Sequence, residues 1–234
     1  KISERIEDSV SISMCYNNMG GVFYSTGDFE KSIAYFKKSL DIKYEYAQPS
    51  EIAISISNIG SVYNQSKKLD SANHYYNKAL SIYEKINDKE GLALCYHNIA
   101  SINSKQGHSE LANLFFLKSI RISEGINDYA MVANSYLLLS KLYFELKDLK
   151  KAEKYGLRSL EYAEKLGFPA EIGDASEILL KIYKALGNNS AAVKMYDQFV
   201  LMKDSVMSVQ TRQEIENQEL TFQFEKKAYA DSLK

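Results

Sequence analysis

The sequence predicts an all-α protein, a solenoid of five tandem helical hairpins followed by a long C-terminal helix. The chain of 234 residues contains two prolines, and neither interrupts a stretch in which apolar residues follow helical spacing. Side-chain sizes recur every 40 residues along most of the chain. A turn signal divides each unit in two, as at Gly27-Asp28 and Gly187-Asn188, so each unit is predicted to form two antiparallel helices.

Small side chains recur at two phases of the 40-residue period. Gly60 lies within a predicted helix, where glycine costs about 1 kcal/mol relative to alanine, so close packing is the expected reason for its presence. Small residues on both helices of a hairpin let the backbones approach, and aromatic residues such as Phe36 and Tyr76 fill the space beside them. The predicted packing residues are Gly20, Gly60, Ala72, Ala112, Ala152 and Ala192.

Breaks in the helical pattern mark where one hairpin ends and the next begins. Asn87-Asp88 and Asn127-Asp128 separate consecutive units, and Asp88 and Asp128 are predicted N-caps of the helices that follow. The predicted solenoid occupies residues 1–205, with units at about 10–48, 49–88, 89–128, 129–168 and 169–205.

The order of residues within a unit carries a resemblance to a known repeat. Apolar, small and aromatic positions, a Gly-Asp turn, and then small, aromatic, small and leucine positions are seen most fully in NNMGGVFYSTGDFEKSIAYFKKSL (17–40). This order resembles the tetratricopeptide repeat. The usual unit of that family has about 34 residues, so the longer units here are expected to have helices nearly a turn longer. The resemblance implies a right-handed superhelix whose first helices line a concave groove.

The resemblance also implies which positions of each unit face the groove. These positions are Asn17, Asn18, Tyr24, Ser57, Asn58, Ser61, Asn64, His97, Asn98, Ser101, Lys141 and Lys181. The first three units are polar and neutral there, whereas the last two carry lysines, which makes Lys141 and Lys181 the candidates for binding a terminal carboxylate.

Asn18, Asn58 and Asn98 form an asparagine row at the 40-residue period. A side-chain amide presents a donor and an acceptor together, so such a row can hold the backbone of an extended peptide whatever its sequence. The alternative is that these side chains are solvated or bond to neighbouring helices. The expected partner is therefore a peptide or protein in the concave groove.

Composition argues against several other functions. A net charge of −1 offers no broad basic field, so no nucleic-acid partner is expected. The three histidines and two cysteines lack metal-ligand spacing, and no phosphate loop or nucleophile motif appears, so we expect no enzyme, metal or cofactor. Cys15 and Cys95 are expected to be buried and unpaired. No apolar run approaches the roughly 20 residues of a membrane span, so no direct membrane insertion is expected.

Residues 206–234 follow the last repeat and are rich in Glu, Gln and Lys, which favours one long helix. Ile215, Phe222 and Tyr229 are spaced by seven, as in a short coiled coil that would form a homodimer. A helix that caps the last repeat is the alternative. The motif FEKKAYADSLK resembles the linker of bacterial repeat-containing sensor proteins, which implies a missing output domain after it.

These resemblances imply the input module of a bacterial signal-transduction protein, most of all a sensor histidine kinase. A LuxR-type regulator or a nucleotidyl cyclase would be an alternative parent, a free-standing scaffold is an alternative from another class, and a receptor for a short signalling peptide is a third. Because the chain begins with Lys, it is expected to be a piece of a longer protein. An extracytoplasmic, periplasmic location is expected, with a cytoplasmic one as the alternative.

Overall fold

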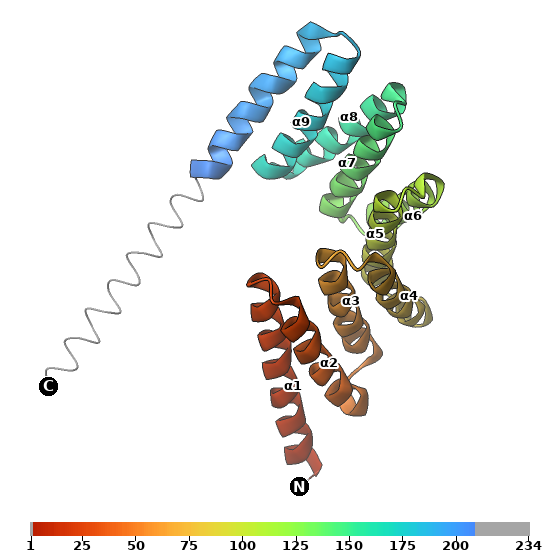
Figure 1. The fold of residues 1–234 in the computed structure, drawn as a ribbon, viewed down its shortest axis with the longest axis vertical. Helices are drawn as coiled ribbons and strands as arrows, with labels where there is room; N and C mark the ends of the chain where they lie inside the picture. Colours follow the sequence, from red (N-terminus) through yellow and green to blue (C-terminus); the bar gives the residue numbers. More distant parts are fainter. Residues whose placement is uncertain (1, 209–234) are drawn as a thin grey trace, which may run out of the picture.

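The computed structural model describes residues 2–208, and within this range the chain is all α-helical, with no strand. Nine helices lie wholly in the described part, namely α1 (Ile2–Ser25), α2 (Phe29–Tyr46), α3 (Pro49–Gln65), α4 (Leu69–Ile86), α5 (Lys89–Lys105), α6 (Ser109–Gly125), α7 (Tyr129–Glu145), α8 (Leu149–Leu166) and α9 (Pro169–Ala185). A further helical segment covers residues 189–208. Figure 1 shows the hairpins stacked one after another along the molecule, which confirms the predicted solenoid.

The predicted C-terminal helix falls mostly outside the described residues. Residues 206–208 continue the helical segment that begins at residue 189, without a break at the predicted boundary. Residues 209–234, which include Ile215, Phe222 and Tyr229, lie outside the described range. Whether this segment caps the repeats or dimerises therefore stays a prediction.

Residues in the left-handed region of backbone conformation, together with helix N-caps, form the turns between helices. Gly27 and Asn87 adopt φ values of 80° and 53°, in the region that glycine and asparagine tolerate best. Asp88 accepts a hydrogen bond from the Gly91 amide at 3.0 Å, and Asp128 caps the next hairpin in the same way. Both predicted N-caps are thus confirmed, because each carboxylate engages an amide that has no partner within its helix.

Close backbone approach within each hairpin explains the small side chains. A Cβ atom at Gly20 would lie 2.8 Å from Cδ1 of Phe36, and one at Gly60 would lie 3.0 Å from Cε1 of Tyr76. On the second helices, the corresponding small residues are all buried, and these are Ala72, Ala112, Ala152 and Ala192. The aromatic ring of the second helix therefore occupies the space that a side chain on the first helix would need.

Buried serines tie the two helices of several hairpins together. In the first hairpin, Ser32 of α2 donates to the carbonyl of Gly20 in α1 at 2.8 Å. In the fourth hairpin the roles are exchanged, and Ser140 of α7 donates to the carbonyl of Ala152 in α8 at 2.7 Å. Three further serines of second helices donate to first-helix carbonyls, namely Ser39, Ser119 and Ser159. Each bond satisfies a buried hydroxyl, as a polar group in a core requires.

Successive hairpins stack so that the first helices lie next to one another. Each second helix contacts the first helix of the next hairpin, and α3 contacts α5, α5 contacts α7 and α7 contacts α9. Cys95 of α5 is buried in this stack, whereas Cys15 at the equivalent position of α1 is exposed. The expectation that both cysteines are buried is therefore wrong for Cys15, because no described hairpin precedes α1.

Candidate functional site

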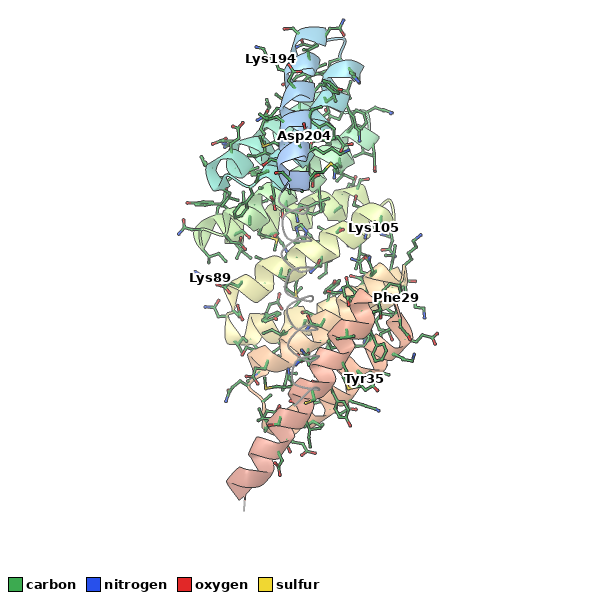
Figure 2. The ribbon with its side chains drawn as sticks, turned by 90° about the vertical axis from the view of Figure 1, so that its left-hand side faces the viewer. Phe29, Tyr35, Lys89, Lys105, Lys194 and Asp204 are labelled. Carbon is green, nitrogen blue, oxygen red and sulfur yellow. The ribbon has the colours of Figure 1, made fainter. Side chains whose placement is uncertain are left out.

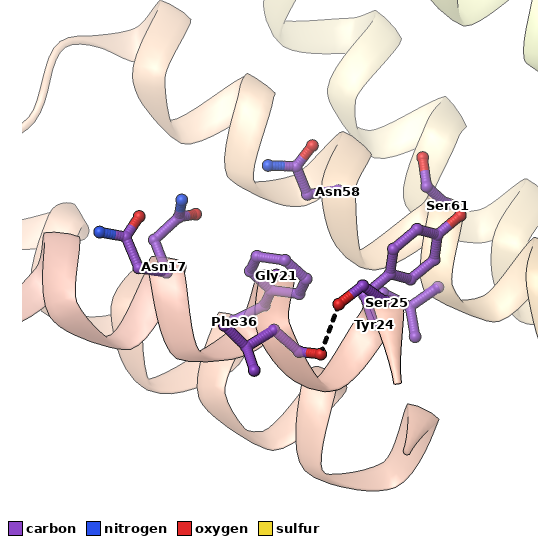
Figure 3. Close-up of a pocket in the computed structure, with 10 residues that line it drawn as sticks. Asn17, Gly21, Tyr24, Ser25, Phe36, Asn58 and Ser61 are labelled. Atoms are coloured by element: carbon purple, nitrogen blue, oxygen red, sulfur yellow. Dashed lines mark hydrogen bonds between the residues drawn. The ribbon is translucent and has the colours of Figure 1, made fainter. Parts of the chain in front are cut away.

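A cavity of about 680 Å³ opens between α1 and α3 on the surface that the first helices form. Its lining comes mainly from these two helices and consists of Asn17, Asn18, Gly21, Val22, Tyr24, Ser25, Phe36, Asn58, Ser61 and Val62. Figure 3 shows Asn17 on α1 and Asn58 on α3, with Phe36 from α2 between them. Five of the residues predicted to face the groove thus meet around one cavity with a partly apolar lining.

The asparagine row is available to a ligand. Asn18 is exposed, and Asn58 and Asn98 are half-buried. None of the three side chains forms a hydrogen bond with another residue in the part of the chain that is described. By contrast, Asn77 on the second helix α4 donates to Asn73. The amides of the row therefore keep their donors and acceptors for water or for a bound peptide.

Two predicted groove residues lie inside the stack, not on its accessible surface. His97 is buried, and its Nδ1 lies 2.8 Å from the hydroxyl of Ser135 in the next hairpin. Burial lowers the pKa of His97 to about 4, so its imidazole is neutral at physiological pH. Ser57 is also buried, with its hydroxyl 4.0 Å from the sulfur of Cys95. Both side chains join neighbouring hairpins.

Other predicted groove residues are engaged by neighbours. Asn64 accepts a hydrogen bond from the ammonium of Lys105 at 2.9 Å, and Ser61 lies 2.9 Å from the hydroxyl of Tyr76. Lys181 pairs with Glu177 at 2.5 Å.

Ser101 is half-buried and Lys141 is exposed. Neither Lys141 nor Lys181 lines the cavity between α1 and α3.

A second cavity of about 410 Å³ lies between α7 and α9, and it is acidic. Its lining is Asp128, Ala130, Met131, Ala133, Asn134, Leu137, Ser159, Glu171 and Asp174. Three carboxylates and no lysine therefore face this part of the groove. Negative charge disfavours a bound carboxylate, so this cavity does not supply the terminal-carboxylate site that Lys141 and Lys181 suggested.

Sequence reasoning missed an apolar row beside the asparagines. Met14, Ile54 and Leu94 lie four residues before Asn18, Asn58 and Asn98, and all three apolar side chains are exposed. Residues four apart occupy the same face of a helix, so each amide has an apolar neighbour one turn away. The 40-residue period was the signal that could have revealed this row.

Other kinds of site are not apparent in residues 2–208. No group of three or more His, Cys, Asp or Glu side chains within this range could hold a metal ion. No helix of the described part is both long and apolar enough to cross a membrane.

Comparison with family models identifies the repeat. A model of the tetratricopeptide repeat matches residues 51–125, and a second model of the same repeat matches residues 15–46 and 133–166. Together the two models cover more than half of the chain. A comparison with curated protein sequences gives no match.

Several solved structures share the fold. BtubC (BKLC) from P. vanneervenii superimposes with a TM-score of 0.76 at 20% identity, over 87% of this chain and 89% of that one. A Rap protein complexed with Competence and Sporulation Factor superimposes with a TM-score of 0.69 at 22% identity, over 80% of this chain and 52% of that one. A STAND protein with a tetratricopeptide repeat sensor, from Pyrococcus horikoshii, superimposes with a TM-score of 0.70 at 21% identity, over 83% of this chain and 30% of that one. The chain thus spans about half of the Rap protein and under a third of the STAND protein.

Proposed function

Because this chain belongs to the tetratricopeptide repeat family, a family of protein–protein interaction modules, we propose that it is a non-catalytic input module that binds an extended peptide or protein segment in its concave groove. The observation that carries this proposal is the row of unengaged amides at Asn18, Asn58 and Asn98. A surface that exposes amides at a regular spacing suits a ligand with a regular backbone.

The binding mode follows from the two neighbouring rows. The amides of the asparagine row bond to the N–H and C=O groups of the peptide backbone. The side chains of the peptide contact the exposed row of Met14, Ile54 and Leu94, which loses water on binding. The cavity of about 680 Å³ between α1 and α3 falls within the usual size of ligand pockets and accepts one larger side chain.

The finer proposal is that the module belongs to a bacterial signalling protein, with a sensor histidine kinase as the leading parent. Two structural neighbours support a sensing role but not the kinase itself, since one is a Rap protein complexed with Competence and Sporulation Factor and the other is a STAND protein with a tetratricopeptide repeat sensor. Binding would change the curvature of the solenoid. Such a ligand transmits a signal only if it binds one curvature more tightly than the other.

The test is a selection of peptides from a random library against the full chain, followed by titration of the best binder. Asn18→Ala and Asn58→Ala each remove one amide from the row, and each is expected to weaken binding roughly fivefold, the value of one hydrogen bond. Asn77→Ala on α4 is the matched control and is expected to leave the affinity unchanged. Equal affinity of the Asn18→Ala and Asn58→Ala variants and the parent chain would exclude the amide row from binding.

A free-standing scaffold is the second candidate, and one observation favours it. This chain matches 89% of BtubC, so a protein exists in which a solenoid of this length makes up nearly the whole chain. Small-angle X-ray scattering with and without the selected peptide distinguishes the two functions. The radius of gyration of a sensor is expected to change on binding, because its curvature changes, whereas that of a scaffold stays the same.

A further inference from the structure

The outer face of α1 has the composition of an interface between hairpins, yet no described residue covers it. Met19 is 39% exposed, whereas Ile59 and Ile99 at the same phase of the repeat are 0% and 2% exposed. Val22 is 60% exposed, and its equivalent Val62 is 1% exposed. Ile12 and Cys15, on the same face, are also exposed. In α3 and α5 this face packs against the second helix of the preceding hairpin.

The helical segment 189–208 exposes the complementary face at the other end of the stack. Tyr196 is 54% exposed, whereas Phe36 and Tyr76 at the same phase are 6% and 1% exposed. Val200 is likewise more exposed than Leu40 and its other equivalents. Terminal repeats of a solenoid usually carry a polar outer face, which keeps the stack soluble and ends it. Within residues 2–208, both ends of the stack instead keep the apolar pattern of an internal repeat.

The interface between α2 and α3 shows how the two faces meet inside the molecule. Lys43 of α2 donates to the hydroxyl of Ser55 in α3 at 2.9 Å. Lys203 has the phase of Lys43 in the segment 189–208, and Cys15 has the phase of Ser55 in α1. α1 and the segment 189–208 therefore carry the two halves of the same kind of interface. α1 and this segment lie at opposite ends of the described stack in Figures 1 and 2, and Lys194 and Asp204 mark the segment 189–208 in Figure 2.

We propose that these two faces bind each other between copies of this chain, so that the segment 189–208 of one copy packs on α1 of the next and the solenoid continues head to tail. The occupant is a second copy because the contact repeats an interface that the molecule already forms between α2 and α3, α4 and α5, α6 and α7, and α8 and α9. Such a contact is heterologous, so it adds copies in a row without closing a pair. Of the residues named on this face, only Val22 also lines the cavity between α1 and α3, so the contact leaves the asparagine row free and does not depend on the proposed peptide binding.

The first test maps the contact with native side chains. A short reagent that joins an amine to a thiol is added to a mixture of isotopically heavy and light copies of the full chain. Because Lys203 would lie against Cys15 as Lys43 lies against Ser55, mass spectrometry is expected to find a heavy–light product that joins Lys203 to Cys15. Lys203→Arg, which keeps the charge without a reactive amine, and Cys15→Ser are expected to abolish it. Absence of this product from the parent chain would overturn the proposal.

The second test uses two variants that each disable one face. Under reducing conditions, sedimentation velocity of the parent chain is expected to show a mean mass that rises with concentration. Met19→Glu and Tyr196→Glu are each expected to weaken self-association at least tenfold, because a charge would be buried in the contact. A mixture of the two variants keeps one intact α1 face and one intact segment 189–208, so it is expected to form dimers that grow no further.

Met14→Glu is the matched control, because it places the same charge on the groove face of α1, and it is expected to leave self-association unchanged. If Tyr196→Glu still associated as the parent does, the contact would be a symmetric pairing of α1 faces and the head-to-tail proposal would be wrong. A parent chain that stays monomeric at all concentrations, as it would if residues 209–234 covered the face at 189–208, would also overturn it.

Discussion

The ring of Tyr83 in α4 lies directly against the backbone of Gly91 in the first turn of α5. A Cβ atom on residue 91 would come within 2.2 Å of Cδ1 and 2.5 Å of Cγ of that ring. Tyr83 is almost fully buried, and its ring atoms near the backbone cannot swing away as the end of a long side chain could. The contact joins the second hairpin to the third, so stacking between repeats accounts for glycine at this position.

Replacement of Gly91 by alanine is therefore expected to destabilise the protein. The added methyl group overpacks the interface between α4 and α5, which typically costs about 1–3 kcal/mol of the free energy of unfolding. Urea denaturation of Gly91→Ala measures this loss. Gly125→Ala is the matched control, because a Cβ atom on Gly125 would lie in open space and the φ of this residue is negative. There alanine is expected to be neutral or to stabilise the helix by up to about 1 kcal/mol.

Removal of a hydroxyl that links two helices is expected to cost less. Ser32→Ala and Ser140→Ala each delete one buried hydrogen bond, in the first and the fourth hairpin. Each is expected to lower the free energy of unfolding by about 1 kcal/mol, measured by the same denaturation. The exposed Ser81 provides the comparison, since Ser81→Ala removes a hydroxyl at the surface. Equal effects at all three positions would mean that the buried bonds add nothing to the packing of the two helices within a hairpin.

Acid is expected to weaken the fold through His97. Burial lowers the pKa of His97 from 6.5 to about 4, so the unfolded chain binds a proton at this side chain more readily than the folded one. The free energy of unfolding therefore has its full value above pH 6.5. It falls as the pH drops toward 4, by at most about 3 kcal/mol.

His97→Asn tests this dependence. The asparagine amide can keep a hydrogen bond to Ser135 but does not titrate in this range. Denaturation at several pH values between 4 and 7 is expected to show a shallower loss of stability for the variant than for the parent chain. Parallel curves for the two proteins would contradict a buried, neutral histidine at this position.

The two cysteines are expected to react at very different rates. Cys15 is exposed, whereas burial raises the pKa of the Cys95 thiol to about 12, so Cys95 has almost no thiolate at neutral pH. A thiol reagent is expected to label one site quickly in the native protein and the second only after unfolding. Cys15→Ser is expected to remove the fast phase, and fast labelling of Cys95 in that variant would place it outside the core.

Most of the turns within and between hairpins could be predicted from their own residues, because the preference of a residue for a turn conformation acts locally. Gly27, Asn87 and Asn127 all adopt positive φ, as these residue types tolerate. Lys67 adopts a φ of 60° in the turn between α3 and α4, although lysine gives no such signal. There the packing of α3 on α4 overrides the local preference, and the repeat period marked the turn better than its own residues.

The candidate site was harder to predict than the fold, because helical spacing does not report how closely neighbouring hairpins approach. Asn17, Ser57 and His97 share one phase of the repeat, yet only Asn17 lines a cavity while the other two are buried between hairpins. Met14 and Ile54 show the opposite, because both are apolar, as core residues usually are, and yet both are exposed. Accessibility at these positions follows from the three-dimensional stack and not from the identity of the residue.

Binding along the asparagine row is the central claim, and an NMR titration of the full chain with isotope-labelled asparagine tests it most directly. When the selected peptide is added, the side-chain amide signals of Asn18 and Asn58 are expected to shift, while those of Asn73 and Asn77 on α4 stay in place. Shifts confined to Asn73 and Asn77, with Asn18 and Asn58 unchanged at saturation, would contradict the account.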